Sequence, residues 1–177
     1  MPSLKYFVCA ILALAAACCL VGAPAEAQVV AFGASNTAGY GVSVSEAYPA
    51  QLETMLRAKG YSVNVINAGV SGDGTQQMLA RIDYAIPAGT RVVILDVGGG
   101  LWNNWRLGVD RAQGPADFAT MKAKLTARRI KIIDLHTNHD MPMQFLQFDR
   151  LHLTPEGHRL DASRLLPSVM DALGPPR

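Results

Sequence analysis

The sequence predicts a three-layer, doubly wound α/β domain whose sheet is mainly parallel and contains four to five strands. The first observation is a set of four short apolar runs, rich in Val and Ile, that are continuous rather than alternating, as in strands buried on both faces. These runs are VVAF, VNVI, VVIL and IKII, at residues 29–32, 63–66, 92–95 and 130–133. The second observation is that amphipathic helical patterns separate the runs, and strand–helix alternation is typical of a parallel sheet covered by helices.

The first 27 residues have the layout of a secretory signal peptide. A lysine near the start is followed by an apolar stretch and by small residues at Ala25 and Ala27, which predicts cleavage after Ala27. The mature protein would be a single domain of residues 28–177, periplasmic or secreted. Because the apolar stretch at residues 6–23 approaches membrane-spanning length, an uncleaved anchor is the alternative.

The composition argues against several classes of site. All three cysteines, Cys9, Cys18 and Cys19, lie in the predicted signal peptide, so the mature chain has no disulfide, thiol nucleophile or thiolate metal site. The formal net charge of +2 comes from scattered basic residues, which does not indicate a nucleic-acid partner. The mature length of about 150 residues is enough to bury one apolar core.

Four helices are expected, each indicated by apolar residues on one helical face. These are Tyr48, Leu52, Met55 and Leu56; Met78, Leu79 and Ile82; Phe118, Met121 and Leu125; and Leu165, Leu166, Val169 and Leu173. Gly60 is placed to end the first helix, and Gly114–Pro115 precede the third. In the last helix Thr154 is the expected N-cap, Pro155 takes the first position, and Pro167 is expected to kink or split it.

Three loops should open on one edge of this sheet, where ligands of doubly wound domains bind. Ser35 follows the first strand, NAGVSGDGT at 67–75 follows the second, and DVGGGLWNNW at 96–105 follows the third. Ser35 alone is weak evidence, because serine is common in glycine-rich turns. The surrounding GASNTAG lacks both the G-x-G-x-x-G spacing and the lysine of a phosphate-binding loop.

A serine nucleophile needs a base and a group that orients the base. Asp149 and His152, three residues apart in FDRLHLTPEGH, can present both side chains from one short loop. His158 is expected at the surface or in a cap contact. His136 and His139, with Asp134 and Asp140, suggest a metal site, but no third histidine has suitable spacing, and no metal is predicted.

Three blocks in this order resemble the SGNH (GDSL-type) hydrolases, and most of all their small periplasmic thioesterase, lysophospholipase and arylesterase branch. The blocks are FGASNTAGYGVSVSEAYPAQL, NAGVSGDGTQQMLAR and DRLHLTPEGH, and they cover nearly the whole mature chain. The resemblance implies that Ser35 is the nucleophile, His152 the base and Asp149 its orienting group. It implies that the backbone N–H groups of Ser35 and Gly72 stabilise the oxyanion, and that no cofactor is needed.

The chain departs from the family pattern at two places. Ala34 stands where the first block has an aspartate that braces the turn. The third block, Gly-x-Asn-Asp, supplies a side-chain oxyanion donor in the family. An ungapped alignment puts Gly100 and Leu101 at its Asn-Asp positions. An insertion of GLW instead puts Asn103 there as the donor, with Asn104 as its substitute.

The resulting hypothesis is a secreted serine esterase or thioesterase that acts on small acyl esters or thioesters. A lipid is among its candidate substrates. Met141, Met143, Phe145 and Phe148 would suit an acyl chain, or equally a loop that covers the core. The alternative is a catalytically impaired binding protein of the same fold, for acyl or carbohydrate ligands, with Trp102 and Trp105 as the binding surface. A flavodoxin-like flavin binder would share the fold class but not the motifs.

Overall fold

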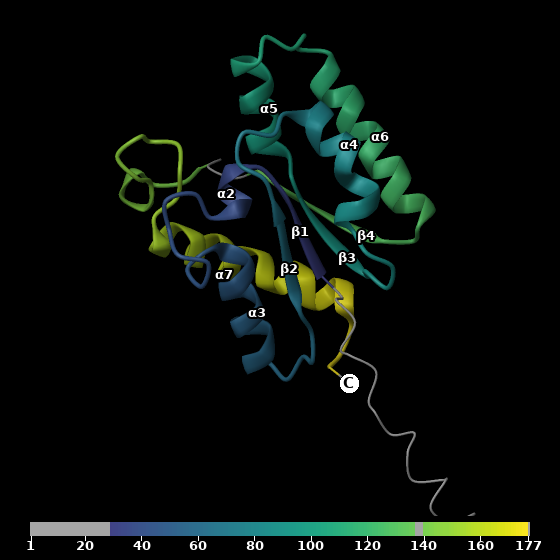
Figure 1. The fold of residues 1–177 in the computed structure, drawn as a ribbon. Coiled ribbons are helices and arrows are strands. Elements are labelled where there is room, and N and C mark those ends of the chain that lie inside the picture. Colours follow the sequence, from purple (N-terminus) through teal and green to yellow (C-terminus); the bar gives the residue numbers. More distant parts are fainter. Residues whose placement is uncertain (1–28, 137–139, 177) are drawn as a thin grey trace, which may run out of the picture.

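The computed structural model describes residues 29–136 and 140–176. Its four strands form one parallel sheet in the order β2-β1-β3-β4, which confirms the predicted doubly wound class (Figure 1). The strands are β1 (Val29–Gly33), β2 (Val65–Gly69), β3 (Val92–Asp96) and β4 (Lys131–Leu135). The helices are α2 (Ser35–Ala38), α3 (Tyr48–Ala58), α4 (Thr75–Ala85), α5 (Val97–Arg106), α6 (Gln113–Ala127), the 3₁₀ turn η2 (Met143–Phe145) and α7 (Pro155–Leu173).

The sequence pattern located the central strands well and one edge strand less well. Every residue of β1 and β3 is buried, as their unbroken apolar runs predict. The second strand was expected at 63–66 but pairs with β1 from Val65 to Gly69. It therefore includes Asn67. This polar side chain is exposed, and it is tolerated because β2 is at the edge of the sheet, where a side chain can reach water.

Helices cover both faces of the sheet, with α3 and α7 on one face and α4 and α6 on the other (Figure 1). Alternate residues of β1 divide between the two cores: Val29 and Ala31 pack with α3 and α7, whereas Val30 and Phe32 pack with α4 and α6. The predicted apolar stripes of these helices supply the opposite walls of both cores.

Helix α7 begins as predicted, but Pro167 does not split it. The Thr154 hydroxyl accepts a hydrogen bond from the N–H of Gly157 at 3.1 Å, and Pro155 takes the first helical position. The helix then continues through Pro167 to Leu173. Pro167 and Ser163, whose carbonyl loses its helical partner, are both exposed, so water can satisfy that carbonyl.

Of the two alternatives for His158, the surface position is wrong and the cap contact is found, at the start of α3. The first turn of α7 packs against the start of α3, which leaves His158 fully buried with its Nδ1 accepting the N–H of Tyr48 at 3.3 Å. Burial lowers the pKa of His158 to about 4. Asp161, one turn further on, is also buried, and burial raises its pKa to about 7. His158 Nε2 and Asp161 Oδ2 have no hydrogen-bond partner within the described part of the chain.

Replacing Asp161 by Asn should stabilise the protein at pH 8. An unfolded aspartate titrates near pH 4, so between pH 4 and 7 the unfolded state loses a proton that the folded state keeps. Stability therefore falls as the pH rises through this window. We expect the free energy of unfolding of Asp161→Asn to exceed that of the wild type by roughly 2 to 4 kcal/mol at pH 8. Urea unfolding at pH 4 and pH 8 checks this, since an equal difference at both pH values would assign the effect to packing.

Candidate active site

Ser35 lies directly beyond the carboxyl end of β1, as the first residue of α2. Glycines at the ends of two strands let α2 rest on the sheet edge. A Cβ on Gly33 would collide with Thr37, and a Cβ on Gly69 would collide with the backbone of Ala38. As the first residue of a helix, Ser35 also has a backbone N–H with no acceptor inside that helix.

The structure brings Ser35, His152 and Asp149 into one hydrogen-bonded chain. His152 Nε2 lies 2.9 Å from Ser35 Oγ, and His152 Nδ1 lies 2.5 Å from Asp149 Oδ2. The other carboxylate oxygen, Asp149 Oδ1, accepts the backbone N–H groups of Leu151 and His152, each at 3.0 Å. This tight turn carries Arg150 with φ of +57°.

The charge on Asp149 fixes the direction of the hydrogen bonds between Asp149, His152 and Ser35. The backbone N–H of His152, followed by its ring, lowers the pKa of Asp149 to about 2. The ionised carboxylate accepts the proton on Nδ1, which leaves Nε2 free to accept the hydroxyl proton of Ser35. A serine with a proton acceptor in line is the arrangement required for nucleophilic catalysis.

Asn36 anchors the loop of His152, and the sequence pattern did not single it out. This buried amide accepts the N–H of Leu153 at 3.0 Å and donates to the carbonyl of Leu151 at 3.2 Å, and so holds the chain on both sides of His152. The ring of Tyr40 lies 4.4 Å from the imidazole, centroid to centroid. An amide next to a candidate nucleophile carries no periodicity signal, so only the fold reveals its role.

Replacing Asn36 by Leu should lower kcat for ester hydrolysis by about 10- to 100-fold with little change in KM, because a small displacement of a catalytic group is costly. Asn36→Asp is the matched variant, since it keeps an acceptor for the N–H of Leu153 and should retain more activity. Steady-state kinetics and thermal unfolding are measured together. A fall in Tm with unchanged kcat would show that Asn36 only stabilises the fold.

The loop after β2 places Gly72 at the same edge. Gly72 has φ of +90°, and a Cβ there would meet nothing among the described residues, so its backbone conformation explains the glycine. The neighbouring Asp73 pairs with the buried Arg81 at 2.6 Å. Arg81 also donates to the carbonyls of Gly33 and Ala68, so one cation ties this loop to the ends of β1 and β2.

The segment after β3 was expected to be a loop, but it is the helix α5 despite three consecutive glycines. Close packing explains these glycines. A Cβ on Gly99 would lie 2.9 Å from the side chain of Ala34, and a Cβ on Gly100 would lie 2.9 Å from Met78 Sδ. Gly100, the Asn position in the ungapped alignment, therefore faces the layer of α4 rather than Ser35.

The two candidate amide donors on α5 both brace the Gly72 loop. Asn103 Nδ2 donates to the carbonyl of Asp73 at 2.9 Å. Asn104 is engaged at both polar ends, because Oδ1 accepts the N–H of Thr75 and Nδ2 donates to its hydroxyl. Among the described residues, neither asparagine lines the cavity at Ser35.

Asp96 braces the nucleophile turn where Ala34 lacks a carboxylate. It accepts the hydroxyl of Thr37 at 3.1 Å and the N–H of Gly99 at 3.3 Å, and so joins α2 to the start of α5. The buried Ala34 packs against Gly99. The small side chain at position 34 thus allows α5 to approach the nucleophile turn closely.

A cavity of about 330 Å³ opens beside Ser35. It is lined by Ser35, Asn36, Gly98, Gly99, Trp102, Asp149, Arg150 and Leu151. Of the four apolar residues before the His152 loop, Met141 is buried, Phe145 is half-buried, and Met143 and Phe148 are exposed.

The described residues contain no group of three or more His, Cys, Asp or Glu side chains arranged to hold a metal ion. Asp134 instead forms an ion pair with Lys122 at 2.5 Å. His139 and the predicted signal peptide lie outside the described residues. Within residues 29–136 and 140–176, no helix is long and apolar enough to cross a membrane.

Comparison with known proteins relates this chain to a family. Residues 31–147 match the model of the GDSL-like lipase/acylhydrolase family, a stretch that ends just before Asp149.

The chain is 30% identical over 113 residues to esterase TesA of Pseudomonas aeruginosa, and this alignment covers 62% of this chain and 53% of TesA. It is 37% identical over 78 residues to thioesterase 1/protease 1/lysophospholipase L1 of Escherichia coli, which is 44% of this chain and 36% of that protein. The chain therefore spans about half or less of the length of these curated relatives. The crystal structure of TesA superposes with a TM-score of 0.71 at 20% identity, and covers 82% of this chain and 99% of that one.

Proposed function

The chain belongs to the GDSL-like lipase/acylhydrolase family, and we propose that it is a secreted serine esterase or thioesterase acting on small acyl esters. The main support for the proposal is that Asp149, His152 and Ser35 are joined by hydrogen bonds beside a cavity. The esterase and thioesterase names of its relatives agree with this reaction class.

In the proposed reaction, Ser35 Oγ attacks the carbonyl carbon of the ester while His152 Nε2 takes the hydroxyl proton. The tetrahedral intermediate collapses, the bond to the leaving group breaks, and His152 returns the proton to the departing alcohol or thiol. Water then attacks the acyl-enzyme with His152 again as the base, and the acid and free Ser35 are regenerated. Asp149 holds the ring in its Nδ1–H form and stabilises the imidazolium. No step requires a metal or a cofactor.

The oxyanion would be stabilised by the backbone N–H groups of Ser35 and Gly72, with Asn103 as the third donor. Each asparagine uses one Nδ2 hydrogen, for the carbonyl of Asp73 or the hydroxyl of Thr75. Asn103 is the better candidate because its amide is held at Nδ2 alone, whereas Asn104 is also held through Oδ1 by the N–H of Thr75. The signal peptide predicted at residues 1–27 supports export.

The proposal is tested by hydrolysis of p-nitrophenyl acetate and a longer-chain ester by the wild type, Asn103→Ala and Asn104→Ala. If Asn103 is an oxyanion donor, its loss should lower kcat by about 10²- to 10³-fold on either ester. Asn104→Ala is the matched control for bracing of the Gly72 loop and should cost less. Equal losses of kcat in Asn103→Ala and Asn104→Ala would mean that Asn103 only braces the Gly72 loop. The absence of hydrolysis by the wild type would refute the esterase.

One observation favours a second candidate, a binding protein of this fold with impaired catalysis. Both asparagines are engaged with the Gly72 loop, and Trp102 is half exposed at the cavity. Such a protein would bind acyl or carbohydrate ligands at Trp102 without turnover. Ligand-induced quenching of tryptophan fluorescence, without ester hydrolysis, would identify it.

A further inference from the structure

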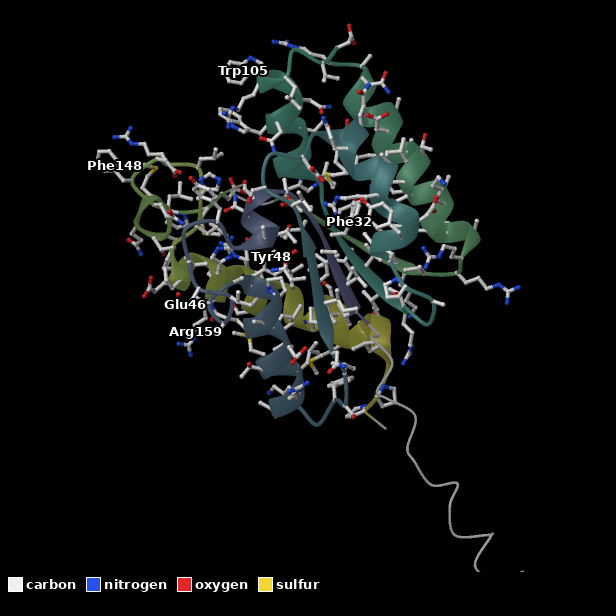
Figure 2. All side chains as sticks on the ribbon, viewed as in Figure 1. Phe32, Glu46, Tyr48, Trp105, Phe148 and Arg159 are labelled. Carbon is white, nitrogen blue, oxygen red and sulfur yellow. The ribbon has the colours of Figure 1, made fainter. Side chains whose placement is uncertain are left out.

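Exposed apolar side chains gather on the edge of the molecule that carries Ser35. Ten large apolar residues are exposed in the described chain, and six of them come from the two segments that follow β3 and β4. We call these six the apolar rim: Leu101, Trp102, Trp105, Leu107, Met143 and Phe148. Figure 2 shows Trp105 and Phe148 projecting outward from the upper left of the molecule, away from the buried Phe32 and Tyr48.

The two segments that carry the apolar rim both contribute to the lining of the cavity. Trp102 lines the cavity from α5, and its ring lies 5.2 Å from that of Trp105. Arg150 and Leu151 line the same cavity, two and three residues after the fully exposed Phe148. An isolated exposed aromatic ring needs no explanation, but six exposed apolar residues on the two segments that line one cavity mark an interaction surface.

The polar groups of the same two segments indicate the partner. Arg106, Arg111 and Arg150 are exposed, and their guanidinium groups form no ion pair or hydrogen bond with the described residues. Asp149 pairs with His152, whereas Asp110 accepts the N–H of Ala112 and keeps its negative charge, so any attraction to an anionic partner must come from the three free guanidinium groups themselves. Free guanidinium groups beside Trp and Phe match a phospholipid surface, where aromatic rings lie at headgroup level and arginine binds phosphate.

We propose that the apolar rim is a docking surface for an anionic phospholipid membrane, which would present ester substrates to the cavity that the same two segments line. The delivery of a substrate rests on the esterase activity proposed above, whereas docking does not. The rim residues enter the headgroup region, and Arg106, Arg111 and Arg150 contact lipid phosphates. The cavity mouth then faces the lipid.

The chain offers a direct readout of docking, because Trp102 and Trp105 are its only two tryptophans. Mature Ser35→Ala protein is titrated with vesicles of phosphatidylcholine containing one quarter phosphatidylglycerol, and tryptophan emission and cosedimentation are followed. We expect a saturable blue shift, and binding at least about fivefold weaker to pure phosphatidylcholine. Phe148→Ser in the same background should weaken binding by at least about fivefold. The matched control is Tyr84→Ser, which removes an exposed ring near the end of α4 and should bind unchanged.

Several outcomes would overturn docking. They are the absence of any shift or cosedimentation, equal binding to pure phosphatidylcholine, equal losses in Phe148→Ser and Tyr84→Ser, and a stable dimer without vesicles that is abolished by Phe148→Ser. Since Ser35→Ala is used throughout, vesicle binding without wild-type hydrolysis of soluble esters would refute only the esterase. Hydrolysis without vesicle binding would refute only the docking surface.

Discussion

Replacing Ser35 by Ala is expected to lower kcat on p-nitrophenyl acetate by about 10⁴- to 10⁶-fold, to a rate set by binding and the oxyanion donors alone. The reason is covalent: without Oγ no acyl-enzyme forms, and His152 Nε2 loses the group 2.9 Å away whose proton it accepts. The fold should tolerate the change, because neighbouring contacts through Asn36 and Thr37 do not involve this hydroxyl. Thermal unfolding should therefore be nearly unchanged.

Ser71→Ala is the control for the Ser35 experiment. Ser71 is an exposed serine beside Gly72, at the same sheet edge, and its hydroxyl has no part in the proposed reaction. Its loss should leave kcat within a factor of about two or three. Substantial ester hydrolysis by Ser35→Ala, or an equal loss in Ser71→Ala, would mean that another group attacks the ester.

Replacing Asp149 by Asn is expected to lower kcat by about 10⁴-fold at neutral pH, the size of effect seen when a serine hydrolase loses this carboxylate. The amide oxygen can still accept the backbone N–H groups of Leu151 and His152, so the turn should persist. What changes is the bond to Nδ1. An amide can donate a proton to Nδ1, which would leave the Nε2–H tautomer facing Ser35.

This second prediction is checked by kcat at pH 6 to 9 together with thermal unfolding, with Asp110→Asn as the control for loss of an exposed charge. Because the pKa of Asp149 is held at about 2, its carboxylate is ionised across this whole range, and the ratio of wild-type to variant rates should not follow its titration. A loss of less than tenfold would mean that Asp149 does not orient the base.

The parts of the fold that could be predicted are those with a strong local pattern. β1 and β3 are unbroken apolar runs, and a hydroxyl and a proline at Thr154 and Pro155 set the start of α7. The shared edge of parallel strands predicts only that the loops after the first three strands lie together, and the pairing of Ser35 with Asp149 and His152 was implied by the family resemblance.

The remaining features depend on tertiary packing that no local pattern encodes. Helix α5 forms through three glycines because Gly99 lies against Ala34 and Gly100 against Met78, which outweighs the poor helix propensity of glycine. His158 is buried because α3 covers it, although its neighbours in the sequence are polar. The role of Asn36 depends on a loop more than 100 residues away.

The most direct test of the proposed mechanism is to label the mature protein with a fluorophosphonate probe and map the adduct by mass spectrometry. Attack by Ser35 Oγ forms an oxygen–phosphorus bond and expels fluoride, which leaves a stable analogue of the tetrahedral intermediate. The mechanism predicts one adduct per chain, on the peptide that contains Ser35, lost in Ser35→Ala and strongly slowed in Asp149→Asn. An unlabelled protein, or an adduct on any other residue, would contradict the assignment of Ser35 as the nucleophile.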